Sequence, residues 1–148
     1  MHIKSANIIL YCKKWEEMVT FYKTGLALPI TTSTEWFVEF RLTRTSRLSV
    51  ADESRTSIKS SSGEGITIGI QVADAITFRA HLKNTGLNPT EVKEVWGAKA
   101  FYVFDPEGNR IEFWSGPARA WLENITCSRI HPKTQWSKFP LLDFSRVA

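Results

Sequence analysis

The hairpin that decides the fold lies at residues 96–114, which read WGAKAFYVFDPEGNRIEFW. Its centre, residues 105–109, combines an aspartate that can hold turn amides, a proline with a preset φ and a glycine that tolerates positive φ. On both sides of this centre, apolar residues alternate with other residues, as they do in half-buried strands. The stretch therefore predicts two antiparallel strands joined by a tight turn.

A duplicated unit makes up most of the remaining sequence. Two strand-like segments, residues 7–12 and 66–72, are each followed by an amphipathic helical segment. Both helical segments end in the same tripeptide, Thr-Gly-Leu, at residues 24–26 and 85–87. Each half then continues with alternating apolar runs, at residues 36–40 and 48–50 and at residues 101–103 and 111–113. Each half therefore predicts a βαβββ module.

The two predicted helices end at the glycines of these tripeptides. The first carries an apolar stripe from Trp15 to Leu26 and is predicted to end at Gly25. The second has Asp74 as its N-cap and is predicted to close at Gly86. Between the modules, the serine-rich residues 54–65 predict a linker with little ordered structure.

With these modules upstream, the segment 96–114 resembles the last hairpin of glyoxalase and bleomycin-resistance proteins, which belong to the vicinal-oxygen-chelate superfamily. The resemblance covers residues 5–116. It implies an α+β fold in which two tandem βαβββ modules form a curved mixed sheet with an open cleft, with the helices on the outer face. The implied domain is residues 1–116, with modules at 5–53 and 66–116 and the linker at 54–65, followed by a C-terminal extension, residues 117–148.

The resemblance also implies where a metal would be held. Metal-dependent members place four ligands, usually His and Glu, at equivalent strand positions, which fall here on Asn7, Ser49, Thr67 and Glu112. Only Glu112 matches, and a single carboxylate with three neutral oxygens suits zinc, iron or nickel poorly. The three histidines, His2, His81 and His131, do not fall at ligand positions. We therefore expect no metal and no cofactor, as in the bleomycin-resistance-like branch.

Strand alternation, with Glu112 as the reference, predicts which side chains face the cleft. Aromatic rings with a few polar groups would suit a flat organic molecule, and the carboxylates would suit a cationic substituent. The complementary residues, Leu10, Val38, Val50, Ile70, Val103 and Phe113, are predicted to form the core. Ile9 and Gly69 are predicted to lie on the cleft side. The predicted ligand contacts are Asn7, Tyr11, Phe37, Glu39, Ser49, Thr67, Gln71, Tyr102, Phe104, Arg110, Glu112 and Trp114.

Several of these residues have structural alternatives. Tyr102, Phe104 and Trp114 could equally pack in the core or at a dimer interface, where aromatic residues are enriched. The Glu112 carboxylate could form an ion pair with Arg110 or Lys99 instead of contacting a ligand. These alternatives stay open at the level of sequence.

Composition and charge limit the function classes. The 148 residues are 43% hydrophobic and 23% charged, which is typical of a folded domain, and no apolar run is long enough to span a membrane. Residues 1–116 carry 14 Lys+Arg against 13 Asp+Glu, whereas residues 117–148 carry 5 against 2. No basic patch for nucleic acid is evident in the modules. Cys12 and Cys127 form no redox or zinc motif, and we expect a cytoplasmic protein with a buried Cys12.

Three functions are compatible with the sequence. The leading hypothesis is a metal-free small-molecule-binding protein of the bleomycin-resistance type, which sequesters an aromatic, drug-like compound that could be cationic. The alternative is an enzyme of the same superfamily, of lyase, isomerase or dioxygenase type, that uses Glu112 in an atypical site. The third is an interaction protein whose aromatic, basic tail docks on a partner chain or nucleic acid. The resemblance also implies a homodimer, and we expect no nucleic-acid or membrane partner.

Overall fold

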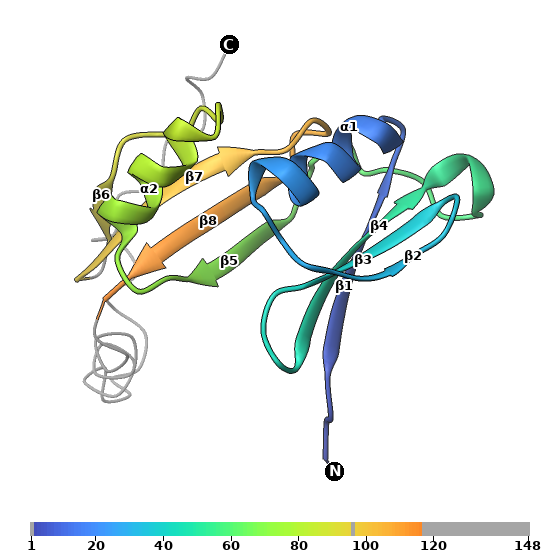
Figure 1. The fold of residues 1–148 in the computed structure, drawn as a ribbon, viewed down its shortest axis with the longest axis horizontal. Helices are drawn as coiled ribbons and strands as arrows, with labels where there is room; N and C mark the ends of the chain where they lie inside the picture. Colours follow the sequence, from blue (N-terminus) through green and yellow to red (C-terminus); the bar gives the residue numbers. More distant parts are fainter. Residues whose placement is uncertain (1, 96, 117–148) are drawn as a thin grey trace, which may run out of the picture. The chain divides into compact units, whose positions relative to one another are not determined.

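The computed structural model describes residues 2–95 and 97–116 (Figure 1). The first module contains β1 (Ala6–Cys12), α1 (Trp15–Thr20), a π-helical turn η1 (Phe21–Gly25), β2 (Ile30–Ser33), β3 (Phe37–Arg41) and β4 (Ser46–Asp52). After the short helix η2 (Glu53–Arg55), the second contains β5 (Thr67–Gln71), α2 (Ala75–Asn84), β6 (Lys93–Val95), β7 (Ala98–Phe104) and β8 (Arg110–Ser115). Trp96 and the predicted C-terminal extension, residues 117–148, lie outside the described residues.

The two modules have the same topology, which confirms the predicted α+β fold with two βαβββ units. Each forms a four-stranded mixed sheet, in the orders β1-β4-β3-β2 and β5-β8-β7-β6, and neither sheet is closed. The first strand of each module runs parallel to the last, whereas the other pairs are antiparallel. Helix α1 packs against β4, and α2 packs against β7 and β8 (Figure 1). Each sheet therefore has a helix-covered face and a face turned away from its helix, here called the helix-free face.

The core lies between each sheet and its helix. Of the six residues predicted to form it, Leu10, Val38, Val50, Val103 and Phe113 are at most 5% exposed, and Ile70 is half-buried against the same cluster. Cys12 is also buried, as predicted. The sequence further suggested that both faces of the first strand would be covered, and this is wrong near its start. Ile8 and Ile9, which point to opposite faces of the sheet, are 36% and 42% exposed.

The repeated Thr-Gly-Leu tripeptides contact each other. The Thr85 hydroxyl donates a hydrogen bond of 3.1 Å to the Gly25 carbonyl, and a Cβ added at Gly25 would lie 3.2 Å from the Leu87 side chain. The second helix begins and ends as predicted, with Asp74 accepting from the Thr77 amide and Gly86 at φ 85°. The first helical segment is less regular than predicted, since only α1 is α-helical and η1 completes it as a π-turn.

The predicted hairpin turn between β7 and β8 is confirmed and also joins the two modules. Asp105 Oδ1 accepts the amides of Glu107 and Asn109, and Gly108 has φ 87°. The other oxygen of the buried Asp105 accepts the Tyr22 hydroxyl at 2.9 Å. Burial, together with the charge of Asp105, raises the pKa of Tyr22 above its usual range, so the phenol stays protonated and remains a donor.

The serine-rich segment between the modules is more ordered than its composition suggests. The Ser60 amide donates to Glu53, and the Ser60 hydroxyl donates to Glu107 of the β7–β8 turn. Gly63 lies so close to that turn that an added Cβ would be 2.4 Å from the backbone of Gly108. These contacts were not expected for a linker with little ordered structure, because composition does not reveal the partners of serine hydroxyls and glycine backbone. Among the described residues, no helix has the length and apolarity needed to cross a bilayer.

Candidate functional site

The helix-free face of the first module carries a closed polar network. Ser49, fully buried, donates its hydroxyl to Asn7 Oδ1 at 3.0 Å, and Asn7 Nδ2 donates to Glu39 Oε2 at 3.4 Å. The other Glu39 oxygen accepts the Thr31 hydroxyl at 2.6 Å and lies 3.6 Å from Arg47 Nε. Strand register helps to form this grouping, since Glu39 is paired with Ser49 and Asn7 is paired with Arg47 in the sheet. The polar groups of this face are satisfied largely by one another.

The helix-free face of the second module is arranged differently. Arg110 Nε donates to the Thr67 hydroxyl at 2.9 Å, and the Arg110 guanidinium lies 4.9 Å from the centre of the Tyr102 ring. Glu112 is paired in register with Gly69 on one side and Tyr102 on the other. Glu112 is a half-buried residue, and its carboxylate has no hydrogen-bond or ion-pair partner within residues 2–95 and 97–116. The ion pair with Arg110 or Lys99 that the sequence left open is therefore not formed among these residues.

Gly69 leaves room beside Glu112. A Cβ built at Gly69 would meet no atom within 4 Å, and its backbone does not have the positive φ that disfavours other residues. In the first module the equivalent position is Ile9, which pairs with Ser49 as Gly69 pairs with Glu112. Phe104, at 56% exposed, lies on the same face as Glu112. The second module thus presents a carboxylate, open space and aromatic rings together.

The twelve predicted contact residues lie on helix-free faces, as their strand register indicates. In the described part of the chain, no side-chain hydrogen bond joins the contact residues of the first module to those of the second. That these twelve residues contact a ligand stays a prediction. The first module contributes Asn7, Tyr11, Phe37, Glu39 and Ser49, and the second contributes Thr67, Gln71, Tyr102, Phe104, Arg110, Glu112 and Trp114.

The residues at the four superfamily ligand positions do not fit a transition-metal site. Asn7 and Ser49 are hydrogen-bonded to each other, so their oxygens already have partners. The Thr67 hydroxyl accepts from Arg110, whose positive charge would repel a cation there. Glu112 alone offers a free carboxylate, whereas zinc and iron favour several imidazole or carboxylate ligands. Within the described ranges, no three His, Cys, Asp or Glu side chains are grouped closely enough to hold an ion.

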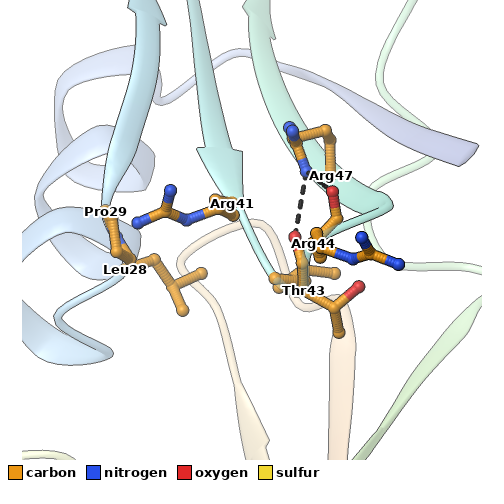
Figure 2. Close-up of a pocket in the computed structure, with 7 residues that line it drawn as sticks. Leu28, Pro29, Arg41, Thr43, Arg44 and Arg47 are labelled. Carbon is orange, nitrogen blue, oxygen red and sulfur yellow. Dashed lines mark hydrogen bonds between the residues drawn. The ribbon is translucent and has the colours of Figure 1, made fainter. Parts of the chain in front are cut away.

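Sequence reasoning missed an arginine-lined pocket in the first module. It has a volume of about 480 Å³ and lies at the turn between β3 and β4 (Figure 2). The available signal was the segment at residues 41–47, RLTRTSR, in which arginine recurs every third residue. None of the twelve predicted contact residues lines this pocket. Its lining residues are Leu28, Pro29, Arg41, Leu42, Thr43, Arg44 and Arg47.

Comparison with known families agrees with this architecture. The model of the Glyoxalase/Bleomycin resistance protein/Dioxygenase superfamily matches residues 2–113. The chain belongs to this superfamily. The match spans both modules, from the residues before β1 to the Ile-Glu-Phe of β8. No curated protein matches the chain.

Solved structures of other superfamily proteins share the fold. A glyoxalase/bleomycin resistance protein/dioxygenase from Nocardioides has 18% identity and a TM-score of 0.66, with 80% of this chain and 86% of that chain covered. A lactoylglutathione lyase from Agrobacterium tumefaciens has 16% identity and a TM-score of 0.61, covering 75% of this chain and 92% of that chain. A glyoxalase-related enzyme from Fulvimarina pelagi has 16% identity and a TM-score of 0.62, with 76% of this chain and 87% of that chain covered. At these identities the likeness concerns the fold alone.

Proposed function

We propose that the protein is a metal-free, small-molecule-binding member of the superfamily, similar to its bleomycin-resistance branch, and that it binds an aromatic, cationic compound. The observation that carries this proposal is Glu112, a half-buried residue whose carboxylate has no partner among the described residues and lies beside the open space at Gly69. A carboxylate without a counter-charge attracts a cationic group. Glu112 would supply the charge recognition.

Aromatic residues around Glu112 support a flat ligand. Tyr102 is its neighbour on β7, and Phe104 and Trp114 lie on the same face. A largely exposed phenylalanine gains from contact with an apolar ligand because its ring is then removed from water. Arg110 is stacked on Tyr102 and bonded to Thr67, which holds it away from an ion pair with Glu112. Tyr102, Phe104 and Trp114 thus offer ring faces, and Glu112 offers a negative charge that has no counter-charge among the described residues.

The proposal is tested by ligand titration of three proteins. The probes are an aromatic quaternary ammonium dye and its neutral isostere, and binding is followed by ligand fluorescence at constant ionic strength. For wild type we expect saturable binding of the cation. Glu112→Gln should weaken cation binding about tenfold and leave the neutral isostere unchanged, which is the effect of one charge-assisted contact. Equal binding of the cation by wild type and Glu112→Gln would refute charge recognition.

The second variant, Gly69→Ile, copies the residue that the first module carries at the equivalent position. The open space and ordinary φ at Gly69 accept a side chain without backbone strain, so the fold should be kept. The new side chain would occupy the space beside Glu112 and should abolish binding of both probes. Unchanged binding in a variant with a wild-type unfolding midpoint would show that this face is not the ligand site.

An unpartnered carboxylate also suits a general base, so a second function is an enzyme of the superfamily in which Glu112 removes a proton from the bound molecule. The same titration separates the two functions. A binding protein returns the probe unchanged, whereas an enzyme converts a substrate analogue and loses turnover in Glu112→Gln while keeping affinity.

We further propose that the protein is a homodimer. The helix-free faces are open in a single chain, and β1 is an edge strand that exposes Ile8 and Ile9. Association through this strand would pair its free backbone edge with a second chain. Light scattering on a sizing column should give twice the chain mass, and Ile9→Lys should shift it to the monomer. A monomeric wild type would contradict this proposal and leave the ligand site in the second module as described.

A further inference from the structure

The arginine-lined pocket of the first module is distinct from the face that holds Glu112. It is formed by the segment before β2 and by the β3–β4 turn (Figure 2). Leu28, Pro29 and Leu42 supply its apolar surface, whereas Arg41, Arg44 and Arg47 supply three positive charges. None of its lining residues is acidic. Among the described residues, the acidic side chain in contact with these arginines is Glu39, whose Oε1 lies 3.6 Å from Arg47 Nε.

Arg47 is held in place by the turn itself. Its Nη1 donates to the carbonyls of Thr43 at 3.0 Å and Ser46 at 3.2 Å, and the bond to Thr43 is drawn in Figure 2. The Nη2 group of Arg47 makes no hydrogen bond with the described residues. A guanidinium that is fixed through two nitrogens and free at the third loses little entropy when it donates to a ligand.

Arg41 and Arg44 are available for a ligand. Neither side chain has a hydrogen-bond or ion-pair partner in the described part of the chain, and both residues are exposed. In Figure 2 the Arg41 side chain extends towards Pro29, whereas the Arg44 side chain extends to the opposite side of the turn. Both side chains have no partner in the described residues and would turn from these positions towards a ligand anchored at Arg47.

We propose that this pocket binds an oxyanion with an apolar substituent, of the phosphate monoester class. Planar guanidinium groups match phosphate oxygens through paired hydrogen bonds, and three of them exceed the charge that Glu39 can offset. The volume of about 480 Å³ is larger than a bare phosphate ion, whose share of space is closer to that of a few water molecules. The apolar part of the ligand contacts Leu28 and Pro29. This site goes beyond the proposed cation site at Glu112.

The test is isothermal titration calorimetry of the full chain with phenyl phosphate and with inorganic phosphate, at constant ionic strength. We expect phenyl phosphate to bind with one-to-one stoichiometry and more tightly than inorganic phosphate. The variant Arg41→Gln/Arg44→Gln should weaken phenyl phosphate by about tenfold or more, because two charge-assisted contacts are lost. The matched control is Lys23→Gln/Arg55→Gln, which removes the same charge from exposed residues outside the pocket and should bind as wild type does.

Each result decides the proposal. Equal affinity in wild type and Arg41→Gln/Arg44→Gln would overturn it, as would equal weakening by the control, which would indicate a general effect of net charge. Inorganic phosphate that binds as tightly as phenyl phosphate would overturn the apolar part of the assignment. Glu112→Gln should leave phenyl phosphate binding unchanged, so failure of the cation site and failure of the oxyanion site are separable.

Discussion

Glu107 is predicted to stabilise the junction between the modules by capping a helix from a distance. Helix α1 begins after Lys14, which provides no side-chain cap. Glu107 Oε1 instead accepts the amides of Lys13 at 3.0 Å and Lys14 at 2.8 Å, and its Oε2 accepts the Ser60 hydroxyl at 2.5 Å. Glu107→Ala removes all three bonds. At about 1 kcal/mol net for each bond, discounted for partial exposure, the variant should lose about 2 kcal/mol of unfolding free energy.

The stabilisation by Glu107 should depend on pH. Burial opposes ionisation of this carboxyl, but the bonds from Ser60, Lys14 and Lys13 outweigh it and hold the pKa below its usual value of 4.5. A lowered folded-state pKa means that the stabilisation is complete above the unfolded-state pKa and is lost as pH falls through the folded-state value. The difference in stability between wild type and Glu107→Ala should therefore shrink below about pH 4.5.

Urea denaturation of wild type, Glu107→Ala, Ser60→Ala and the double variant measures this effect. The double-mutant cycle should give a favourable coupling between the two side chains of about 1 kcal/mol at neutral pH. Glu107→Gln keeps an acceptor for the two amides and should lose about half as much stability as Glu107→Ala. A loss under 0.5 kcal/mol for Glu107→Ala (about the noise of surface substitutions), or a loss independent of pH, would refute the assignment of a remote cap.

Three further outcomes are expected. Gly63→Ala should lower the unfolding free energy by about 3 kcal/mol in the same urea assay, because its Cβ would lie 2.4 Å from the β7–β8 turn. Gly65→Ala is the control, since Gly65 also has a positive φ but a Cβ there would have nothing within 4 Å, and it should cost about 1 kcal/mol. Tyr22→Phe should lower the unfolding free energy by about 1 to 2 kcal/mol through loss of the bond to Asp105, and a denaturation midpoint equal to wild type would contradict this. Cys12, whose pKa burial raises to about 12, should resist thiol reagents at pH 8 until urea unfolds the chain, which peptide mass spectrometry of the labelled protein can establish.

Features with a local signal were predictable from the sequence. The β7–β8 turn follows from Asp105 and Gly108, and the start of α2 follows from Asp74, because each residue acts on backbone within a few positions of itself. The short strands β2 and β6 were not located, since four and three residues are too few for a period of two to show. The capping of α1 by Glu107 was also beyond prediction, because the two segments are about 90 positions apart.

In the candidate site, too, features set by neighbouring residues were predictable, whereas features set by residues distant in sequence were not. Alternation placed the predicted contact residues on one face of each sheet, because a period of two is fixed by the backbone. Which polar groups have partners could not be predicted, because Asn7, Ser49 and Glu39 come from three strands that are distant in sequence. The arginine pocket was missed for a related reason, since a turn gathers Arg41 and Arg47 only once the hairpin is formed.

The duplicated modules have diverged in a way that separates a structural face from a binding face. At equivalent positions the first module has Ile9 and Ser49, whereas the second has Gly69 and Glu112. In the first, a partly exposed isoleucine occupies the position of the glycine and the fully buried serine is bonded within the polar network, so the polar groups of this face are satisfied by one another. In the second, the glycine leaves space beside a carboxylate that lacks a partner among the described residues. A carboxylate without a counter-charge, with open space beside it, can pair with a bound cation. Giving the second module the first module's pair, as Gly69→Ile with Glu112→Ser, should therefore abolish cation binding, and unchanged binding would refute this division of roles.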